Sequence, residues 1–213
     1  MCKETKWEQW ADESQSVLWK LLDERSQPVS EAEEIDRRIW DRYGDEGAIV
    51  FTDLCGFTHR SVEKGVIHFL QIIFESQRLL RPVIKQYKGS LIEAVGDSML
   101  LWFTDVEEAL NCSLEMQAAC GDFNAGREPI DQMLLCVGIS YGPVLRIGYS
   151  RLAGVEVNIA SKLGEDIAEG YEILVSKAAR QAATNMTGLE FTLTGIDLPG
   201  TDEVYRVSRR HSD

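Results

Sequence analysis

The chain has 213 residues, enough for one domain with a sizeable core and a short extension. Its net charge of −13 and sequence pI near 4.7 repel phosphates and anionic lipid, so we expect neither a nucleic acid nor a membrane surface as a partner. No apolar run reaches the roughly 18–20 residues of a membrane span, and the acidic N-terminus is unlike a signal peptide, so we expect a cytoplasmic protein.

The N-terminal part predicts two helices. Apolar residues at three- to four-residue spacing indicate a first helix from Thr5 to about Arg25, which ends before Pro28. A second, from a cap at Ser30, runs to about Tyr43. We expect residues 1–45 to form a helical extension that is a dimerising arm, a lid, or a helix pair packed on its own domain.

The main domain, expected over residues 46–213, mixes strands and helices irregularly, which predicts an α/β or α+β fold with a mixed or antiparallel sheet. Periodicity and turn residues predict strands at 48–53, 90–95, 99–103, 134–140, 144–148, 172–175, 190–194 and 203–207. The predicted helices cover about 61–86, 105–119 and 155–168, with a short one after Ser176. We expect Gly142-Pro143 to turn a hairpin and residues 121–129 to be a flexible linker.

Two acids stand where strands end. The segment Phe51–Thr58 places Asp53 after an apolar strand and before a glycine turn, and Val95-Gly96-Asp97 repeats the setting. An Asp beside a Gly is often only a turn former. Two carboxylates at neighbouring strand ends, however, can hold two divalent cations about 3.5–4 Å apart, which is the chemistry of nucleotidyl transfer.

Four segments in order carry a family resemblance. The chain resembles the catalytic domain of the class III nucleotidyl cyclases, the adenylate and guanylate cyclases, over about residues 47–207; the matching segments are 51–58, 92–97, 137–142 and 154–163. The resemblance implies an α+β, ferredoxin-like βαββαβ core. It also implies a head-to-tail homodimer with active sites at the interface and a nucleoside triphosphate as substrate.

The same resemblance implies residue roles. Asp53 and Asp97 match the family's two metal-binding acids for Mn²⁺ or Mg²⁺, supported by the main-chain oxygen of Leu54. The turn amides of Gly56, Phe57 and Thr58 would bind the triphosphate, as backbone nests do.

Asn158 matches the ribose-orienting asparagine of the family, and on a helix Lys162 shares its face. Lys162 stands where the family usually has an arginine that stabilises the transition state, so the charge is kept and the planar fork is lost. Both residues are expected to act on the partner subunit's substrate.

Two other positions depart from the family. Cys136 and Pro199 replace an arginine and a triphosphate-binding lysine. Compensation could come from Arg146, Lys177 or Arg180. Otherwise, the domain would be a catalytically degenerate module that senses nucleotides or dimerises.

At the two base-reading positions the chain has Glu93 and Arg151, a pair that is neither adenylate- nor guanylate-cyclase-like. A carboxylate accepts a ring N–H and a guanidinium donates to a carbonyl, a pattern that suits uracil and guanine. The two could instead point elsewhere, or pair with each other. The chain is similar to free-standing bacterial pyrimidine cyclases of anti-phage signalling, whose product acts on a separate effector. We therefore expect UTP first and GTP second.

Other chemistries lack their signatures. The five cysteines are odd in number without CxxC pairing, so we expect thiols and neither a disulfide framework nor a zinc site. The three histidines have no paired spacing, no nucleophile elbow is present, and the Gly-Gly-acid-acid-Phe turn of diguanylate cyclases is absent.

Overall fold

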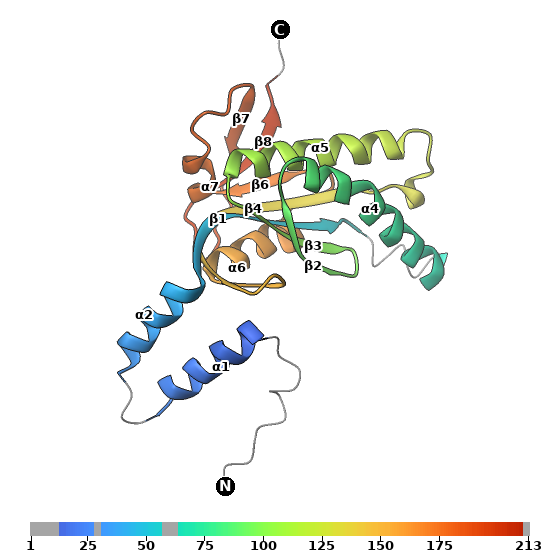
Figure 1. The fold of residues 1–213 in the computed structure, drawn as a ribbon. Coiled ribbons are helices and arrows are strands. Elements are labelled where there is room, and N and C mark those ends of the chain that lie inside the picture. Colours follow the sequence, from blue (N-terminus) through green and yellow to red (C-terminus); the bar gives the residue numbers. More distant parts are fainter. Residues whose placement is uncertain (1–12, 28–30, 57–63, 211–213) are drawn as a thin grey trace.

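A single sheet organises the fold, with strand order β2-β3-β1-β4-β6-β8-β7 and β5 beside β4 (Figure 1). The computed structural model describes residues 13–27, 31–56 and 64–210. Neighbouring strands are antiparallel except β4 and β6. The strands are β1 Gly44–Leu54, β2 Ser90–Val95, β3 Ser98–Phe103, β4 Leu135–Ile147, β5 Arg151–Ala153, β6 Ile173–Ser176, β7 Leu189–Leu193 and β8 Val204–Arg209.

The helices connect these strands in a recognisable order. They are α1 Glu13–Arg25, α2 Ala32–Tyr43, α4 Val66–Gln86, α5 Val106–Asn124, α6 Val155–Ser161 and α7 Lys177–Ala182, with a 3₁₀ turn η2 Pro129–Asp131 and a π-helix η3 Lys162–Ile167. The run β1-α4-β2-β3-α5-β4 with spatial order β2-β3-β1-β4 is the ferredoxin-like arrangement. The expected α+β core is therefore confirmed.

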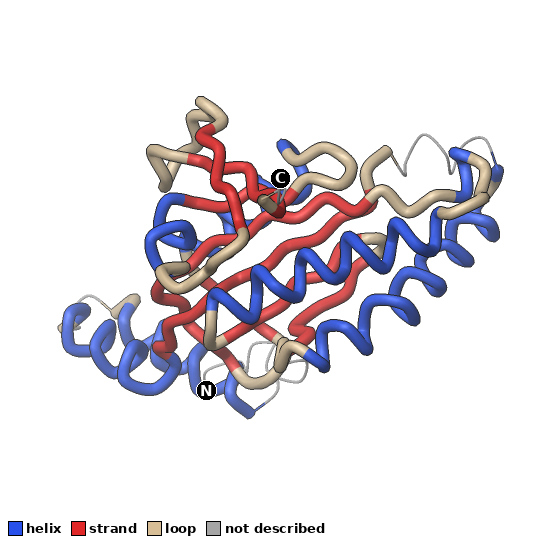
Figure 2. The backbone as a smooth tube through the Cα atoms, turned by 90° about the horizontal axis from the view of Figure 1, so that it is seen from above, coloured by secondary structure: helices blue, strands red, loops and turns tan. Residues whose placement is uncertain are grey.

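The two faces of the sheet are covered unequally. Helices α4 and α5 lie side by side over one face (Figure 2), where the main core packs around Leu80, Leu101, Phe103, Leu110 and Met116. On the opposite face, α6 and η3 lie over β1, β4 and β6. Over β2 and β3 the cover is only partial: Trp102 is buried in a small cluster with Leu152 of β5, and the candidate site lies beside this cluster.

The N-terminal helices pack on their own chain. Residues of α1 and α2, such as Leu18, Leu21 and Ile39, form one apolar cluster with Ile147 at the end of β4. The Arg25 guanidinium binds the Asp36 carboxylate at 2.5 Å across the pair. The contact agrees with a helix pair packed on its domain. The predicted start of the first helix, at Thr5, and the predicted cap, Ser30, lie outside the described residues.

The expected hairpin turn at Gly142-Pro143 is wrong. β4 continues through both residues to Ile147 because β1, which begins at Gly44, supplies a partner for every position from Leu135 to Leu145, with Glu46 opposite Pro143. The reversal instead follows at 148–150, where Gly148 has a φ of 64°.

Two expected helix ends also differ. α5 continues through Gly121 to Asn124, so the first part of the expected flexible linker is helical. The Asn124 side chain holds this end by bonding both the amide and the carbonyl of Met133, at 2.7 and 2.8 Å. The helix expected over 155–168 changes from α to π at Lys162.

Two glycines let α6 and η3 lie directly on the sheet. A Cβ on Gly138 of β4 would stand 2.2 Å from the Ala160 carbonyl oxygen and 2.4 Å from the Gly164 amide nitrogen. A Cβ on Gly164 would meet the Phe51 carbonyl oxygen at 2.6 Å. All of these neighbours are main-chain atoms, which cannot rotate aside. The distance between helix and sheet is therefore set by glycine at both positions.

We predict that Gly138→Ala lowers the free energy of unfolding by about 1–3 kcal/mol or more, since overpacking forces the helix away from the sheet. Gly121→Ala, in the last turn of α5 with no atom near its added methyl, is the matched control and should raise stability by up to about 0.5–1 kcal/mol. Urea unfolding followed by circular dichroism measures both. If the Gly138→Ala variant and the native chain are equally stable, the helix can move away from the sheet without a loss of stability.

Candidate active site

The two predicted metal acids lie at the same end of the sheet. Asp53 is the penultimate residue of β1, and Asp97 follows Gly96 in the turn between β2 and β3. β1 pairs with β3, with Thr52 opposite Met99, so the turn comes beside the end of β1. The Ser98 hydroxyl donates to Asp53 Oδ1 at 2.9 Å and joins the two segments.

The electrostatics of this pair favour a bound cation. Partial burial raises the pKa of the Asp97 carboxyl, and the negative charges of Asp53 and Glu165 raise this pKa further, against a main-chain hydrogen bond that lowers it. Carboxylates that disfavour each other's ionisation gain when a positive ion comes between them.

The donor set fits Mg²⁺ or Mn²⁺. Asp53 and Asp97 offer hard oxygen ligands, which these ions prefer. Within residues 13–27, 31–56 and 64–210, no group of three or more His, Cys, Asp or Glu side chains could enclose a metal. Two carboxylates with open positions suit an ion that also binds substrate phosphates.

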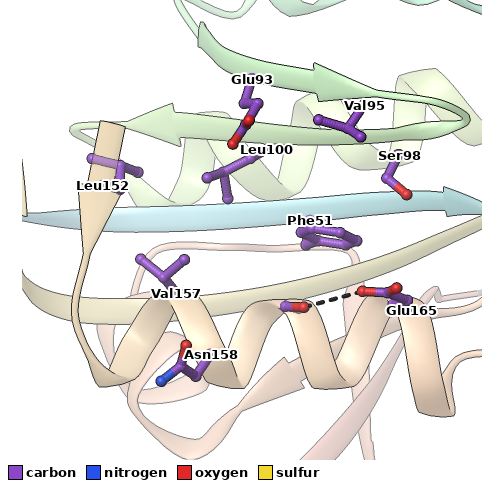
Figure 3. Close-up of a pocket in the computed structure, with 10 residues that line it drawn as sticks. Phe51, Glu93, Val95, Ser98, Leu100, Leu152, Val157, Asn158 and Glu165 are labelled. Atoms are coloured by element: carbon purple, nitrogen blue, oxygen red, sulfur yellow. Dashed lines mark hydrogen bonds between the residues drawn. The ribbon is translucent and has the colours of Figure 1, made fainter. Parts of the chain in front are cut away.

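An open pocket of about 400 Å³ lies next to these acids, between the β1–β3 strands and α6 (Figure 3). Ser98, Val95 and Glu165 lie toward one end of it, while Glu93, Leu152 and Asn158 lie toward the other (Figure 3). The remaining lining residues are Phe51, Leu100, Val157 and Ser161. The pocket thus has an acid end, which adjoins Asp53 through Ser98, and an Asn158 end.

A β-bulge turns Glu93 toward the pocket. Leu91 pairs with Leu101, but Glu93 then pairs with Leu100, so Ile92 is the extra residue. In a regular ladder Glu93 would oppose Met99 and face α4 and α5. Bulges re-aim side chains in this way. The sequence prediction that Glu93 reaches the substrate pocket therefore agrees with its position here.

Asn158 and Lys162 lie one α-helical turn apart, because the Lys162 amide donates to the Asn158 carbonyl. Asn158 lines the pocket from α6. Lys162 begins the π-helix, is exposed, and binds the Asp166 carboxylate. The expected spacing of the two residues on one helix therefore agrees with the structure, although only Asn158 is among the described residues that line the pocket. Their catalytic roles remain predictions.

Arg151 lies away from the pocket. Leu152, its neighbour in β5, lines the pocket, and adjacent strand residues point to opposite faces. Arg151 is exposed, and no ion pair between it and Glu93 is found among the described residues. Glu93 and Arg151 are therefore not brought together within one chain.

The structure describes only some of the residues whose main chains were predicted to bind the metal or the triphosphate. Leu54 has a buried side chain, so only its main chain could serve a metal. Gly56 forms an exposed turn with a φ of 70°. Phe57 and Thr58 lie outside the described residues.

None of the three candidate compensating cations lines the pocket. Arg146 binds Asp45 at 2.7 Å, Lys177 binds Asp202 and Glu203, and the Arg180 guanidinium lies 4.4 Å from the ring centre of Phe191. Cys136 is buried and Pro199 is exposed. The described residues that line the pocket include two carboxylates and no basic side chain.

Three polar residues of this site were missed in the sequence. Ser98 follows Asp97 directly and could have been found as a strand-end hydroxyl next to an acid. Ser161 and Glu165, which share a hydrogen bond of 3.3 Å, follow Asn158 by three and seven residues, and this helical spacing could have marked them as pocket residues.

Ser98→Ala should weaken Mn²⁺ binding or activity about 10- to 100-fold, as is typical when a residue that orients a metal ligand is lost. Titration of Mn²⁺ by calorimetry measures the effect. Ser161→Ala, on the opposite wall of the pocket, is the matched control and should change Mn²⁺ affinity less. Unchanged affinity in the Ser98→Ala protein would mean that the serine does not position Asp53.

Comparisons with known proteins identify the fold's relatives. The chain is 25% identical to a crystallised adenylate/guanylate cyclase/hydrolase from Silicibacter pomeroyi, with a TM-score of 0.65 and coverage of 77% of this chain and 95% of that one. A guanylate cyclase domain from Catenaria anguillulae, crystallised with GTP, shares the fold at 18% identity and a TM-score of 0.66, covering 78% and 98% of the two chains.

A curated relative, the serine/threonine-protein kinase pkn2 of Myxococcus xanthus, is 25% identical over 164 residues, 76% of this chain but 20% of that protein. The chain thus spans about a fifth of that relative's length. No described helix is long and apolar enough to cross a membrane. The model of the adenylate and guanylate cyclase catalytic domain matches residues 41–206, and the chain belongs to this family of nucleotidyl cyclases.

Proposed function

We propose that this chain converts a nucleoside triphosphate, with UTP preferred, to its 3′,5′-cyclic monophosphate and pyrophosphate. The observation that carries the proposal is the acid pair Asp53 and Asp97 at one end of a pocket that also presents Glu93 and Asn158. Family membership supports the reaction class.

In this reaction the 3′ oxygen of the ribose bonds to the α-phosphorus and pyrophosphate leaves. Asp53 and Asp97 would hold two divalent cations, which activate the 3′ oxygen and neutralise the leaving group when bound. Ser98 keeps the Asp53 carboxylate in place. Asn158 offers an amide that orients the ribose, and the apolar walls around Phe51 and Leu100 exclude water from the bound base.

The preference for UTP rests on Glu93. Its carboxylate is an acceptor, and both uracil and guanine carry a ring N–H, whereas the ring nitrogens of adenine and cytosine are acceptors. Because Arg151 faces away within the chain, it does not support the base reading there, and GTP remains the second candidate. A role in anti-phage defence, with a separate effector for the product, rests on the resemblance and on a pyrimidine product.

The arrangement also favours a head-to-tail homodimer. Asp53 and Asn158 serve opposite ends of one pocket, so a two-fold axis would set the acid end of one chain against the Asn158 end of the other. In addition, α4 exposes an apolar stripe that has no partner within the described chain, with Ile67 75% and Phe74 63% exposed.

A second candidate is a degenerate cyclase domain that binds nucleotides without turnover. Within the part of the chain that the structure describes, the pocket lining has no basic side chain, and Lys162 is held by Asp166. Unpaired carboxylates would then repel a triphosphate in the absence of metal.

Incubation of the protein with all four ribonucleoside triphosphates and Mn²⁺, with products identified by mass, tests the function. We expect cyclic UMP as the main product, and at least about a hundredfold loss of rate in Asp53→Ala and Asp97→Ala because each removes an anchor for charge stabilisation. Chelation by EDTA should abolish activity in the native protein.

The outcomes separate the alternatives. Cyclic GMP or cyclic AMP as the main product would support the cyclase activity and reject the proposed preference for UTP. Nucleotide binding without any product would favour the degenerate module. Full activity of both aspartate variants would reject the metal assignment.

Mixing two inactive variants tests the shared site. Asp97→Ala and Asn158→Ala alter opposite ends of the pocket, so a heterodimer would contain one intact site and recover up to about half of the native activity per heterodimer. Activity is measured as the ratio of the variants changes at constant total protein.

The control mixes Asp97→Ala with Asp53→Ala, which damage the same end and should stay inactive together. If native mass spectrometry detects Asp97→Ala/Asn158→Ala heterodimers and the mixture stays inactive, the sites are not shared between subunits.

A further inference from the structure

Two cysteines flank the predicted metal ligand Asp53. Cys136 of β4 lies opposite Asp53 in the β1–β4 ladder, and Cys55 follows Asp53 by two residues. The Cys55 amide donates to the Leu134 carbonyl at 2.8 Å, so the pairing of the strands continues to this point. Alternate residues of a strand share a face, which puts Asp53, Cys55 and Cys136 on the same side of the sheet.

The two thiols are in contact. Both belong to the apolar cluster beneath α6 and η3, with Ile159 and Leu163 above them. Burial raises the pKa of the Cys136 thiol, and the neighbouring Cys55 raises it further. Cys136 is only 2% exposed, whereas Cys55 is partly exposed in the turn. An oxidant from solvent therefore meets Cys55 first.

We propose that Cys55 and Cys136 are a redox modification site, which a peroxide converts to a disulfide that pulls Asp53 out of its metal-binding position. The peroxide O–O bond breaks as Cys55 becomes a sulfenic acid and one water leaves. The Cys136 sulfur then bonds to the Cys55 sulfur, the S–O bond breaks, and a second water carries away the Cys136 proton. Two thiols are oxidised and one peroxide is reduced.

Strand geometry explains why this bond would move the metal ligand. Cys55 and Cys136 are diagonal neighbours across the ladder, which typically have Cα atoms about 7–8 Å apart, whereas disulfides prefer about 5.5–6 Å. Closing the bond therefore draws the turn toward β4. Gly56, with a φ of 70°, allows the turn to shift, and the Ser98–Asp53 hydrogen bond lies directly beside it.

The other described cysteines provide an internal comparison. Cys112 and Cys120 are fully buried in α5 on the other side of the sheet, where burial raises the pKa of each thiol to about 12. Neither lies near the candidate site. Oxidation by peroxide should therefore spare them while it joins Cys55 to Cys136.

The test oxidises the full, reduced chain with hydrogen peroxide and maps disulfides by peptide mass spectrometry. We expect a Cys55–Cys136 cross-link and a fall of at least about tenfold in Mn²⁺ affinity by calorimetry. Dithiothreitol should then reduce the cross-link and restore the Mn²⁺ affinity. Cys55→Ser and Cys136→Ala should each keep Mn²⁺ affinity after peroxide, while Cys120→Ala should respond as the native chain does. The two cysteine variants are independent, so one suffices if the other fails to fold.

The inference rests on the proposed metal site, and the two can fail separately. No Cys55–Cys136 cross-link, or a cross-link with unchanged Mn²⁺ affinity, overturns the redox site. If the reduced chain binds no Mn²⁺, the metal assignment fails, and the loss of affinity predicted here fails with it, whatever the cross-link map shows.

Discussion

The contact between Gly138 of β4 and the backbone of α6 and η3 determines where the candidate site can form. It places the helix against β1 and β4 without any intervening side chain. Since α6 is short, the β2 and β3 strands beyond it keep a partly open face. Phe51 and Leu100 line that face, and Asn158 comes in from the helix. A side chain between the helix and the sheet would move Asn158 away from the strands that carry the acids.

Much of the fold was predictable because its signals are local. The strands around Asp53 and Asp97 and the long helix α4 followed from periodicity, and the ferredoxin-like order followed from the family resemblance of four motifs. The positions of both acids at one end of the sheet followed from the same signals. The path of β4 did not, because Gly142-Pro143 has turn chemistry that the long partner strand β1 overrides.

Only part of the candidate site can be derived from regular periodicity. Lys162 follows Asn158 by one helical turn, as the spacing predicted, but no sequence signal marked its ion pair with Asp166. Arg151 was expected at the base, whereas within the chain its neighbour Leu152 lines the pocket. Glu93 was expected at the base from its family position; it lines the pocket because of the bulge, and a regular ladder would have put it on the other face of the sheet. Bulges and π turns add one residue and leave no clear mark in composition.

The charge of the pocket limits how a triphosphate could be held. Glu93 and Glu165 line it, Asp53 and Asp97 adjoin it, and no described residue of the lining is basic. These four carboxylates repel a polyanion, and cations at the acid pair would supply an attraction. The replacement of a family arginine by Cys136 fits the same limit. It removes a positive charge next to Asp53 and puts a thiol in contact with Cys55 in its place. Substrate affinity then depends on the position of Asp53 more strongly than in a site with its own cations, which is why a small movement of this turn would have a large effect.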